Sequence, residues 1–377
     1  PEAFDRIARA VGTMARERGI RELVVGYDCR ESSPAFAEIV ARGLNATGID
    51  VVDIGCVSTP LLYFAIAHRE RLGGIQITAS HNPPEYNGLK ICLGGTQSVH
   101  GEGLVEVWRR AEEGKFAEGE GTTRREDMAP TYTEFLKDNV RLGARRLKLV
   151  VDAGNGTGGV VAVPLYRALG FEVDPIYCEM DGRFPNHHPD PTDEKNLADL
   201  KARVLATGAD LGIAFDGDAD RLGIVDERGE VVWGDRLMIV LARALLREAP
   251  GAAVLGEVKC SQTLYDDIER HGGKAILWKT GHSFIKAKLK ESGALLAGEM
   301  SGHIFYAHRY YGFDDALYAS LRLLEVLTAD ARPLSQHFDG VPEMFATPEI
   351  RVDCADEKKF EVVARVPERA HGYGLGA

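Results

Sequence analysis

The sequence predicts an α/β protein of three tandem β-α-β-α-β units with mixed sheets around a central cleft, plus an incomplete fourth α+β domain. Three observations lead to this prediction. Short apolar strands alternate with helix-length segments, the alternation recurs as a long internal repeat, and a polar loop closes each unit. The third strands end at Ser80, Asp216 and Glu299. Because open α/β sheets bind ligands at the carboxyl ends of their strands, these loops are expected to meet in one cleft.

Each element of the repeat is inferred from an apolar run of strand length. The expected strands are, unit by unit, residues 23–28, 51–55 and 74–78, then 149–154, 171–176 and 211–215, then 253–258, 275–278 and 294–297. A hairpin beside the second sheet is predicted from the runs at 222–225 and 231–233. Polar stretches place the expected domains at 1–125, 126–233, 234–340 and 341–377.

The composition indicates a globular enzyme and excludes two classes of partner. The chain has 377 residues, 45% of them hydrophobic, and a formal net charge of -12, which opposes general nucleic-acid binding. No apolar stretch reaches the roughly 20 residues of a membrane-spanning helix. No leader segment is visible, so a cytoplasmic protein is expected. The six cysteines form no CxxC pair and are interpreted as buried free thiols.

The loop after residues 211–215 carries carboxylates on alternate positions, at Asp216, Asp218 and Asp220. Divalent cations such as Mg²⁺ take oxygen ligands, and this spacing in an irregular loop can direct all three carboxylates at one point. The alternative is an acidic surface turn. Because an apolar strand delivers the loop from a core, the metal site is the favoured interpretation.

The loop at 78–90 places a hydroxyl, an imidazole and an amine together, at Ser80, His81 and Lys90. A serine becomes a useful nucleophile when a base or a metal activates it. Ser80 is therefore the candidate covalent centre. The alternative is a turn rich in Asn, Pro and Gly with an incidental serine.

The third loop, residues 298–303, offers Glu299, Ser301 and His303, which can hydrogen-bond sugar hydroxyls. Alone it would be taken for a helix cap or an ordinary turn. Two other segments receive structural interpretations: 152–159 as a tight turn, since it lacks a P-loop lysine, and 181–189 as a packed interdomain loop.

The loops at 78–83, 216–221 and 298–303 together resemble the α-D-phosphohexomutase family, and most closely its bacterial phosphomannomutase/phosphoglucomutase group. Segments 25–30, 181–189 and 278–282 extend the match in order over nearly the whole chain. The resemblance implies a phosphoserine-bearing first domain, a metal-binding second domain, a sugar-binding third domain and a phosphate-binding fourth domain.

The resemblance also implies roles for single residues. Ser80 would carry the phosphoryl group, and an oxygen on it would bind Mg²⁺ together with Asp216, Asp218 and Asp220. The expected catalytic set is Ser80, His81, Lys90, Arg221 and His303, with Lys90 and His303 as the leading proton-transfer candidates and His81 and Lys259 behind them. The expected substrate-binding set is Lys259, Thr280, Gly281, His282, Glu299, Ser301 and His303.

The implied reaction interconverts hexose 1-phosphate and hexose 6-phosphate through a 1,6-bisphosphate, with glucose or mannose 1,6-bisphosphate as activator. Hexose phosphates are the expected partners of a monomer or homodimer. Met300 resembles the group that accepts both glucose and mannose, whereas Gln at that position would resemble phosphoglucosamine mutase.

Three alternatives remain open: a phosphoglucosamine mutase, a haloacid-dehalogenase-like phosphatase with Asp216 as nucleophile, and a non-catalytic sugar-phosphate binding protein. Two family motifs are not found in the printed residues, an amino-terminal Tyr-Asp-Ile-Arg-Gly segment and a phosphate loop after Glu349. We therefore expect a truncated or incomplete fourth unit and a weaker hold on the substrate phosphate.

Overall fold

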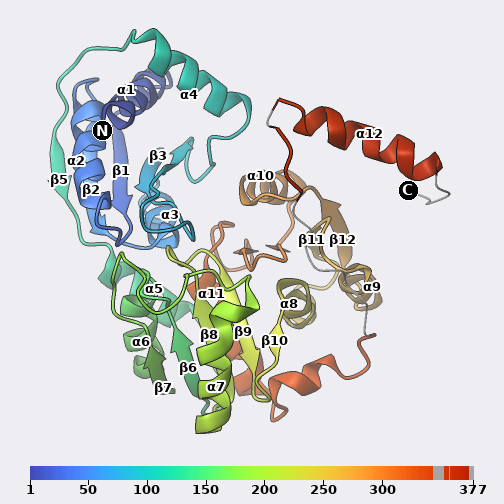
Figure 1. The fold of residues 1–377 in the computed structure, drawn as a ribbon. Helices are drawn as coiled ribbons and strands as arrows, with labels where there is room; N and C mark the ends of the chain where they lie inside the picture. The colour runs from blue at the N-terminus through green and yellow to red at the C-terminus, as the bar shows by residue number, and fades with distance from the viewer. Residues whose placement is uncertain (343–351, 356, 373–377) are drawn as a thin grey trace. The chain divides into compact units, whose positions relative to one another are not determined.

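The computed structural model describes residues 1–342, 352–355 and 357–372. It divides into two compact units, Pro1–Val341 and Pro342–Ala377. The first unit contains three mixed β-sheets (Figure 1), so this part of the fold prediction is confirmed. In the second unit the described residues form one helix, α12 (Lys359–Gly372). Residues 343–351, where the fourth domain was expected to begin, lie outside the described residues.

The first sheet has the strand order β4-β3-β1-β2-β5. Its members are β1 (Glu22–Tyr27), β2 (Asp50–Cys56), β3 (Gly73–Ile77), β4 (Leu89–Leu93) and β5 (Thr123–Arg125), of which β4 is antiparallel to β3. The covering helices are α1 (Glu2–Glu17), α2 (Ser33–Asn45), α3 (Thr59–His68) and α4 (Glu102–Glu113). Leu23 and Val25 belong to one core with α1 and α2, whereas Val24 belongs to another with α3. This alternation explains the continuous apolar run, because both faces of the sheet are covered.

The second sheet has the order β10-β9-β8-β6-β7. Parallel strands β6 (Lys148–Asp152), β7 (Glu172–Ile176) and β8 (Leu211–Phe215) are joined by the hairpin β9 (Leu222–Asp226) and β10 (Val231–Val232), as expected. Its helices are α5 (Ala129–Asn139), α6 (Gly159–Ala168), the 3-10 helix η1 (Glu194–Leu197) and α7 (Ala198–Thr207). The expected strands of both sheets are present. Strand β4 was not expected, because its first residues, Leu89 and Lys90, were assigned to the loop at 78–90, and the short exposed strand β5 was not expected because its polar residues were interpreted as a domain boundary.

The third sheet has the order β12-β11-β13-β14. Its strands are β11 (Ala253–Glu257), β12 (Lys274–Trp278), β13 (Leu296–Gly298) and β14 (Ile304–Tyr306), and β14 is antiparallel to β13. Helices α8 (Gly234–Glu248), α9 (Gln262–Arg270), α10 (His282–Ser292), α11 (Ala316–Ala329) and the 3-10 helix η2 (Leu334–Phe338) complete this part.

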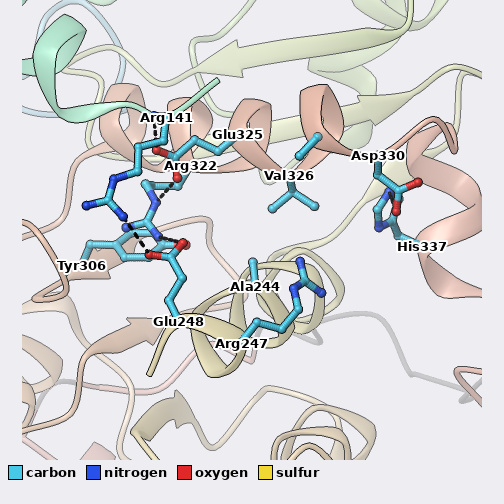
Figure 2. A pocket seen from close by; sticks show the side chains of 11 residues that line it. Arg141, Ala244, Arg247, Glu248, Tyr306, Arg322, Glu325, Val326, Asp330 and His337 are labelled. Atoms are coloured by element: carbon cyan, nitrogen blue, oxygen red, sulfur yellow. Dashed lines mark hydrogen bonds and ion pairs between the residues drawn. The ribbon is translucent and has the colours of Figure 1, made fainter. Parts of the chain in front are cut away.

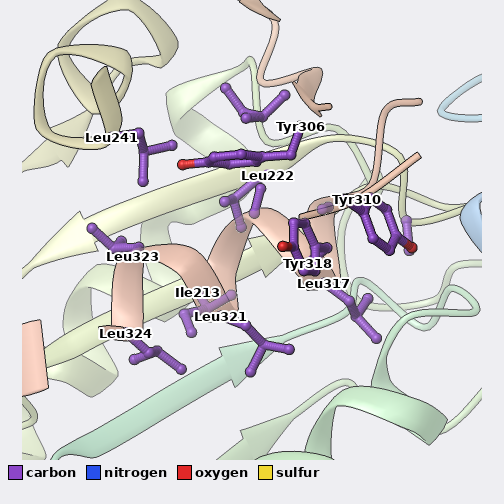
Figure 3. Close-up of a cluster of buried hydrophobic side chains, with 14 of the residues drawn as sticks. Ile213, Leu222, Leu241, Tyr306, Tyr310, Leu317, Tyr318, Leu321, Leu323 and Leu324 are labelled. Atoms are coloured by element: carbon purple, nitrogen blue, oxygen red, sulfur yellow. The ribbon is translucent and has the colours of Figure 1, made fainter. Parts of the chain in front are cut away.

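Helix α11 lies at the centre of the largest core, between elements of the second and third sheets (Figure 3). Its leucines pack with Ile213 of β8, Leu222 of β9 and Leu241 of α8. A polar side chain of α11 also makes a buried contact with the second sheet's helices: Oγ of Ser320 lies 2.5 Å from the hydroxyl of Tyr166 on α6. The helix therefore connects two sheets through one continuous hydrophobic core.

Within the described part of the chain, no helix has the length and apolarity that crossing a lipid bilayer requires. All six cysteines are free thiols. The expectation that they are buried holds for Cys92 and Cys260 but is wrong for Cys354, which is exposed.

Candidate active site

Ser80 lies in the turn that follows β3, and its hydroxyl faces the loop after β8. Its Oγ donates to Oδ2 of Asp216 at 2.9 Å and lies 3.2 Å from Nδ1 of His81. The backbone φ of Ser80 is +50°, a left-handed conformation that residues other than glycine rarely adopt. The Ser80 amide donates to Oγ1 of Thr78 at 2.8 Å. The turn thus directs the hydroxyl at a carboxylate, in a backbone conformation that the surroundings must hold.

Asp216, Asp218 and Asp220 occupy the loop after β8, and all three side chains are fully buried. This loop approaches the Ser80 turn so closely that a Cβ on Gly217 would lie 2.5 Å from the Ser80 carbonyl oxygen. Only glycine fits this position. The nucleophile candidate and the carboxylates, 136 positions apart in sequence, therefore form one site.

The 152–159 turn supports the Asp loop from behind. The amide and Oγ1 of Thr157 donate to the Gly217 carbonyl at 3.0 and 3.3 Å. The 181–189 segment is tied to the same turn, because Nε2 of His187 lies 3.0 Å from Oδ2 of Asp152. Both segments therefore pack around the Asp loop.

Two residues from the first sheet and its helices contact the carboxylate of Asp218. Nζ of Lys90, on β4, lies 2.7 Å from Oδ2 of Asp218 and also contacts Oδ2 of Asp220. Thr59, the first residue of α3, donates its Oγ1 to Oδ2 of Asp218 at 2.5 Å and its amide to the Asp218 carbonyl at 3.0 Å. The Asp loop is thus held by Thr59 and Lys90 from the first sheet's elements and by Thr157 from the second sheet's.

The pKa values of the three carboxylates depend on burial and on their charged neighbours. Burial and the neighbouring carboxylates raise the pKa of Asp216 well above its usual value, and burial together with Asp218 raises the pKa of Asp220. At Asp218 burial is outweighed by the Lys90 ammonium, so its pKa lies below the usual value. Carboxylates crowded this closely repel one another, and a bound cation would relieve that repulsion.

The site fits a divalent cation. Ligand atoms of Asp216, Asp218 and Asp220 lie within 4.8 Å of one another. Oδ1 of Asp218 and Oδ1 of Asp220 are buried and have no hydrogen-bond partner among the described residues. Such oxygens are costly to bury unless a cation or donor satisfies them. An all-oxygen ligand set is the kind that Mg²⁺ prefers.

Arg221 and His303 connect this cluster to the third sheet. Nε of Arg221 donates to Nε2 of His303 at 3.1 Å, and Nδ1 of His303 lies 3.0 Å from Oδ2 of Asp314. Burial opposes protonation of His303, but the carboxylates of Asp220 and Asp314 raise its pKa to about 9. Burial and the Arg221 cation lower the pKa of His81 to about 4. Two imidazoles with opposite tendencies to protonate thus lie at one site, which suits proton exchange.

The other predicted substrate-binding residues range from buried to exposed. Oε1 of the buried Glu299 accepts from the amide of Gly281 at 2.6 Å, and burial raises the pKa of Glu299. Ser301 is half-buried and Thr280 is exposed. The Lys259 side chain is 44% exposed.

A cavity of about 320 Å³ opens at the Ser80 turn. The predicted site residues that line it are Ser80, His81, Lys90, Arg221, His282 and His303. The remaining lining residues are Thr78, Ala79, Asn82, Tyr86, Asn87, Gly88 and Leu89. Among the described residues, the predicted binding residues outside this lining are Lys259, Thr280, Gly281, Glu299 and Ser301.

Three family models match successive parts of the chain. Those for phosphoglucomutase/phosphomannomutase alpha/beta/alpha domains I, II and III match residues 1–118, 130–229 and 233–345. The chain belongs to this family. The resemblance inferred from the motifs is thereby confirmed, and the three sheets correspond in order to the three family domains.

Relatives cover nearly the whole chain. A phosphomannomutase/phosphoglucomutase of Pseudomonas aeruginosa is 44% identical over 370 residues, which span 98% of this chain and 79% of the relative. A phosphoglucomutase of Neisseria gonorrhoeae is 45% identical over 371 residues, spanning 98% and 80%. A crystal structure of a phosphoglucomutase/phosphomannomutase family protein from Burkholderia thailandensis has 43% identity and a TM-score of 0.88, and covers 92% of this chain and 76% of that chain.

This family member has a second cavity, of about 430 Å³, between α8 and α11 (Figure 2). Its charged side chains pair with one another. Nε of Arg322 donates to Oε2 of Glu325 at 2.8 Å, and Nη2 of Arg322 lies 3.7 Å from Oε1 of Glu248. None of the described residues that line it belongs to the predicted site, so the Ser80 cavity is the candidate active site.

Sequence reasoning missed Thr59, Arg30 and Asp314, which contact the Asp loop, the Ser80 turn and His303. Thr59 stands between Ser58 and Pro60, a pattern typical of a helix start, which says nothing of a partner 159 positions away. Asp314 lies in no motif that indicated a contact with His303.

Proposed function

We propose that this phosphohexomutase interconverts the 1- and 6-phosphates of glucose and mannose, with Ser80 as the covalent carrier of the phosphoryl group. The observation that carries the proposal is the 2.9 Å hydrogen bond from Ser80 to Asp216, which brings a strained serine turn to a buried three-carboxylate cluster. Lys90 and Arg221 line the same cavity and supply the positive charge that a transferring phosphoryl group requires.

Asp216, Asp218 and Asp220 would hold Mg²⁺, with an oxygen on Ser80 as a further ligand. When bound, Mg²⁺ neutralises charge on the transferring phosphoryl group. Thr59 and Lys90 keep the Asp218 carboxylate in one orientation, so the ligand set is formed in advance.

In the proposed first step, a hydroxyl oxygen of the hexose phosphate attacks the phosphorus carried on Ser80. The new O–P bond forms and the Ser80 Oγ–P bond breaks. The hydroxyl proton passes to His81, whose low pKa leaves the imidazole unprotonated, while Oγ takes a proton from Lys90 or His303. The product is a bound hexose 1,6-bisphosphate, which also serves as the activator when supplied from outside. After it reorients, Ser80 attacks the other phosphorus, the proton movements reverse, and the isomeric monophosphate is released.

We assign sugar recognition to Glu299 and Ser301, which would bind hydroxyls near the middle of the ring and leave C2 unread. Glucose and mannose then fit equally. Lys259, Gly281 and His282 would face the non-reacting phosphate, together with Thr280.

We further propose that the domains run from 1–125, 126–233 and 234–340 around a central cleft, and that 341–377 begins the phosphate-binding fourth domain. The three sheets fall within the first three of these ranges.

Peptide-mapped mass spectrometry after incubation with glucose 1,6-bisphosphate and Mg²⁺ tests the proposal. Phosphate on Ser80 is expected, and it should be absent in Ser80→Ala but retained in the control Ser292→Ala, which alters a serine at the end of α10. A labile adduct on Asp216 would favour a phosphatase of the haloacid-dehalogenase type. No adduct together with tight binding of glucose 1-phosphate would favour a non-catalytic binding protein, and faster turnover of glucosamine phosphates would favour a phosphoglucosamine mutase.

A further inference from the structure

Arg30 lies beneath the Ser80 turn, and its side chain is fully buried. Its Nη2 donates to the carbonyl oxygens of Ser80 at 2.9 Å and of Asn82 at 2.6 Å, and its Nη1 donates to that of Pro83 at 2.5 Å. Its Nε donates to Oδ2 of Asp28 at 3.0 Å. One guanidinium group therefore holds three backbone carbonyls of the turn that carries the nucleophile candidate.

Asp28 extends this hold to the amide side of the turn. Its Oδ2 also accepts from Oγ1 of Thr78 at 2.8 Å, and the same Oγ1 accepts from the Ser80 amide at 2.8 Å. Oγ of Ser33 donates to Oδ1 of Asp28 at 2.5 Å. Ser80 is thus fixed through its own carbonyl and amide, as its left-handed backbone requires.

The 181–189 segment, which lies between β7 and β8 of the second sheet in the sequence, packs against Arg30. The ring centroid of Phe184 lies 5.1 Å from Cζ of Arg30, within the range of a cation–π contact. A Cβ on Gly182 would lie 2.3 Å from the carbonyl oxygen of Cys29 and 2.6 Å from Cα of Arg30, so this turn packs directly on the Arg30 backbone. Phe184 is itself buried.

We propose that Arg30 is a positioning residue that holds Ser80 for phosphoryl transfer, and that Phe184 keeps the Arg30 guanidinium in place. The inference rests on the proposed function, because it takes Ser80 as the phosphoryl carrier. Arg30 is not among the described residues that line the Ser80 cavity. It therefore affects the reaction by holding the backbone of the Ser80 turn. Three carbonyls and a carboxylate require a planar fork of donors, which the single ammonium group of lysine cannot reproduce.

The test is the single-turnover rate at which Ser80 takes phosphate from glucose 1,6-bisphosphate, followed by intact mass after rapid quenching. Because small misplacements of a reacting group are costly, Arg30→Lys should slow this rate about 100-fold and Phe184→Leu about 10-fold. The Mg²⁺ concentration for the half-maximal rate should change much less than the rate itself, since in the described contacts neither side chain touches a carboxylate of Asp216, Asp218 or Asp220. Arg183→Lys, in the same turn as Phe184 but with its side chain 70% exposed, is the matched control and should keep the wild-type rate.

Melting curves show which variants are folded. If Arg30→Lys does not fold, Phe184→Leu decides by itself. In Arg30→Ala, millimolar guanidinium should restore part of the rate and ammonium should not, because only guanidinium offers a planar donor set.

Wild-type rates in both folded variants would overturn the role of Arg30 and leave the proposed function intact. A loss of rate accompanied by an equal rise in the Mg²⁺ requirement would also overturn it, since it would indicate general damage to the site. Absence of phosphate on Ser80 in the wild-type protein would instead defeat the proposed function, and this inference with it.

Discussion

The Asp loop beside the Ser80 turn and the residues proposed to bind the sugar phosphate differ in how deeply most of their side chains are buried. Asp216, Asp218 and Asp220 are fully buried, and Asp218 is contacted by Thr59 of α3 and Lys90 of β4. Of the residues proposed to bind the sugar phosphate, Glu299 is buried, but Ser301 is half-buried, Thr280 is exposed and the Lys259 side chain is 44% exposed. Transfer of a phosphoryl group needs fixed geometry, whereas the bisphosphate of the proposed reaction, which would bind in two orientations, needs accessible contacts. The contrast therefore matches the two demands of a mutase.

The strongest test of the rigid side is Ser80→Ala. Loss of the phosphoryl carrier should reduce kcat by at least about 10⁴-fold, because nucleophile removal is among the most damaging active-site changes. The coupled assay with glucose 1-phosphate measures this, and the melting temperature should stay close to that of the wild type. Residual activity near wild type would remove Ser80 from the chemistry.

Asp218→Asn removes one charge from the cluster while keeping its shape. The Mg²⁺ concentration for half-maximal activity should rise about 100-fold or more, since a ligand contributes at least as much as its hydrogen-bonding neighbours. Magnesium titration of EDTA-treated protein measures the shift. Asp330→Asn, away from the cluster, is the control, and an unchanged requirement in Asp218→Asn would contradict the metal assignment.

Thr59→Val keeps the side-chain volume and removes only the hydroxyl that Asp218 accepts from. Loss of this orienting contact should raise the Mg²⁺ requirement about 10-fold with little change in KM for glucose 1-phosphate. Thr133→Val, on α5, is the matched control, because its hydroxyl bonds only within its own helix in the described contacts. Equal Mg²⁺ curves for the two variants would show that the hydroxyl of Thr59 does not orient the carboxylate.

On the accessible side, Ser301→Ala should have the smallest effect. One lost hydrogen bond to a sugar hydroxyl should raise KM about 5-fold, with kcat nearly unchanged. The factor should be the same for glucose 1-phosphate and mannose 1-phosphate, because the proposed contact does not read C2. A KM change for only one of the two sugars would show that this loop reads the sugar configuration after all.

The local pattern was enough to predict the strands and the chemical candidates. Apolar runs bounded by polar turns located the parallel strands of all three sheets and the β9–β10 hairpin, and the motifs at Ser80 and Asp216 followed buried strands. Strands β4 and β14, which pair antiparallel with β3 and β13, were not predicted, and strand β5 escaped prediction because its three residues are exposed and polar. The central position of α11 escaped it too, because a helix buried on all sides gives no sign of which sheets it joins.

Which residues could carry chemistry follows from residue type and spacing, since alternate carboxylates and a serine at a strand end are local facts. Which residues hold them follows from contacts across the chain. Thr59 reaches Asp218 over 159 positions, and Arg30 reaches the Ser80 carbonyl over 50. A hydrogen bond between distant segments depends on how the sheets pack, and no local sequence pattern indicates which distant residues will be neighbours. The reacting groups were therefore visible in the printed residues, while their supports became visible only in the folded chain.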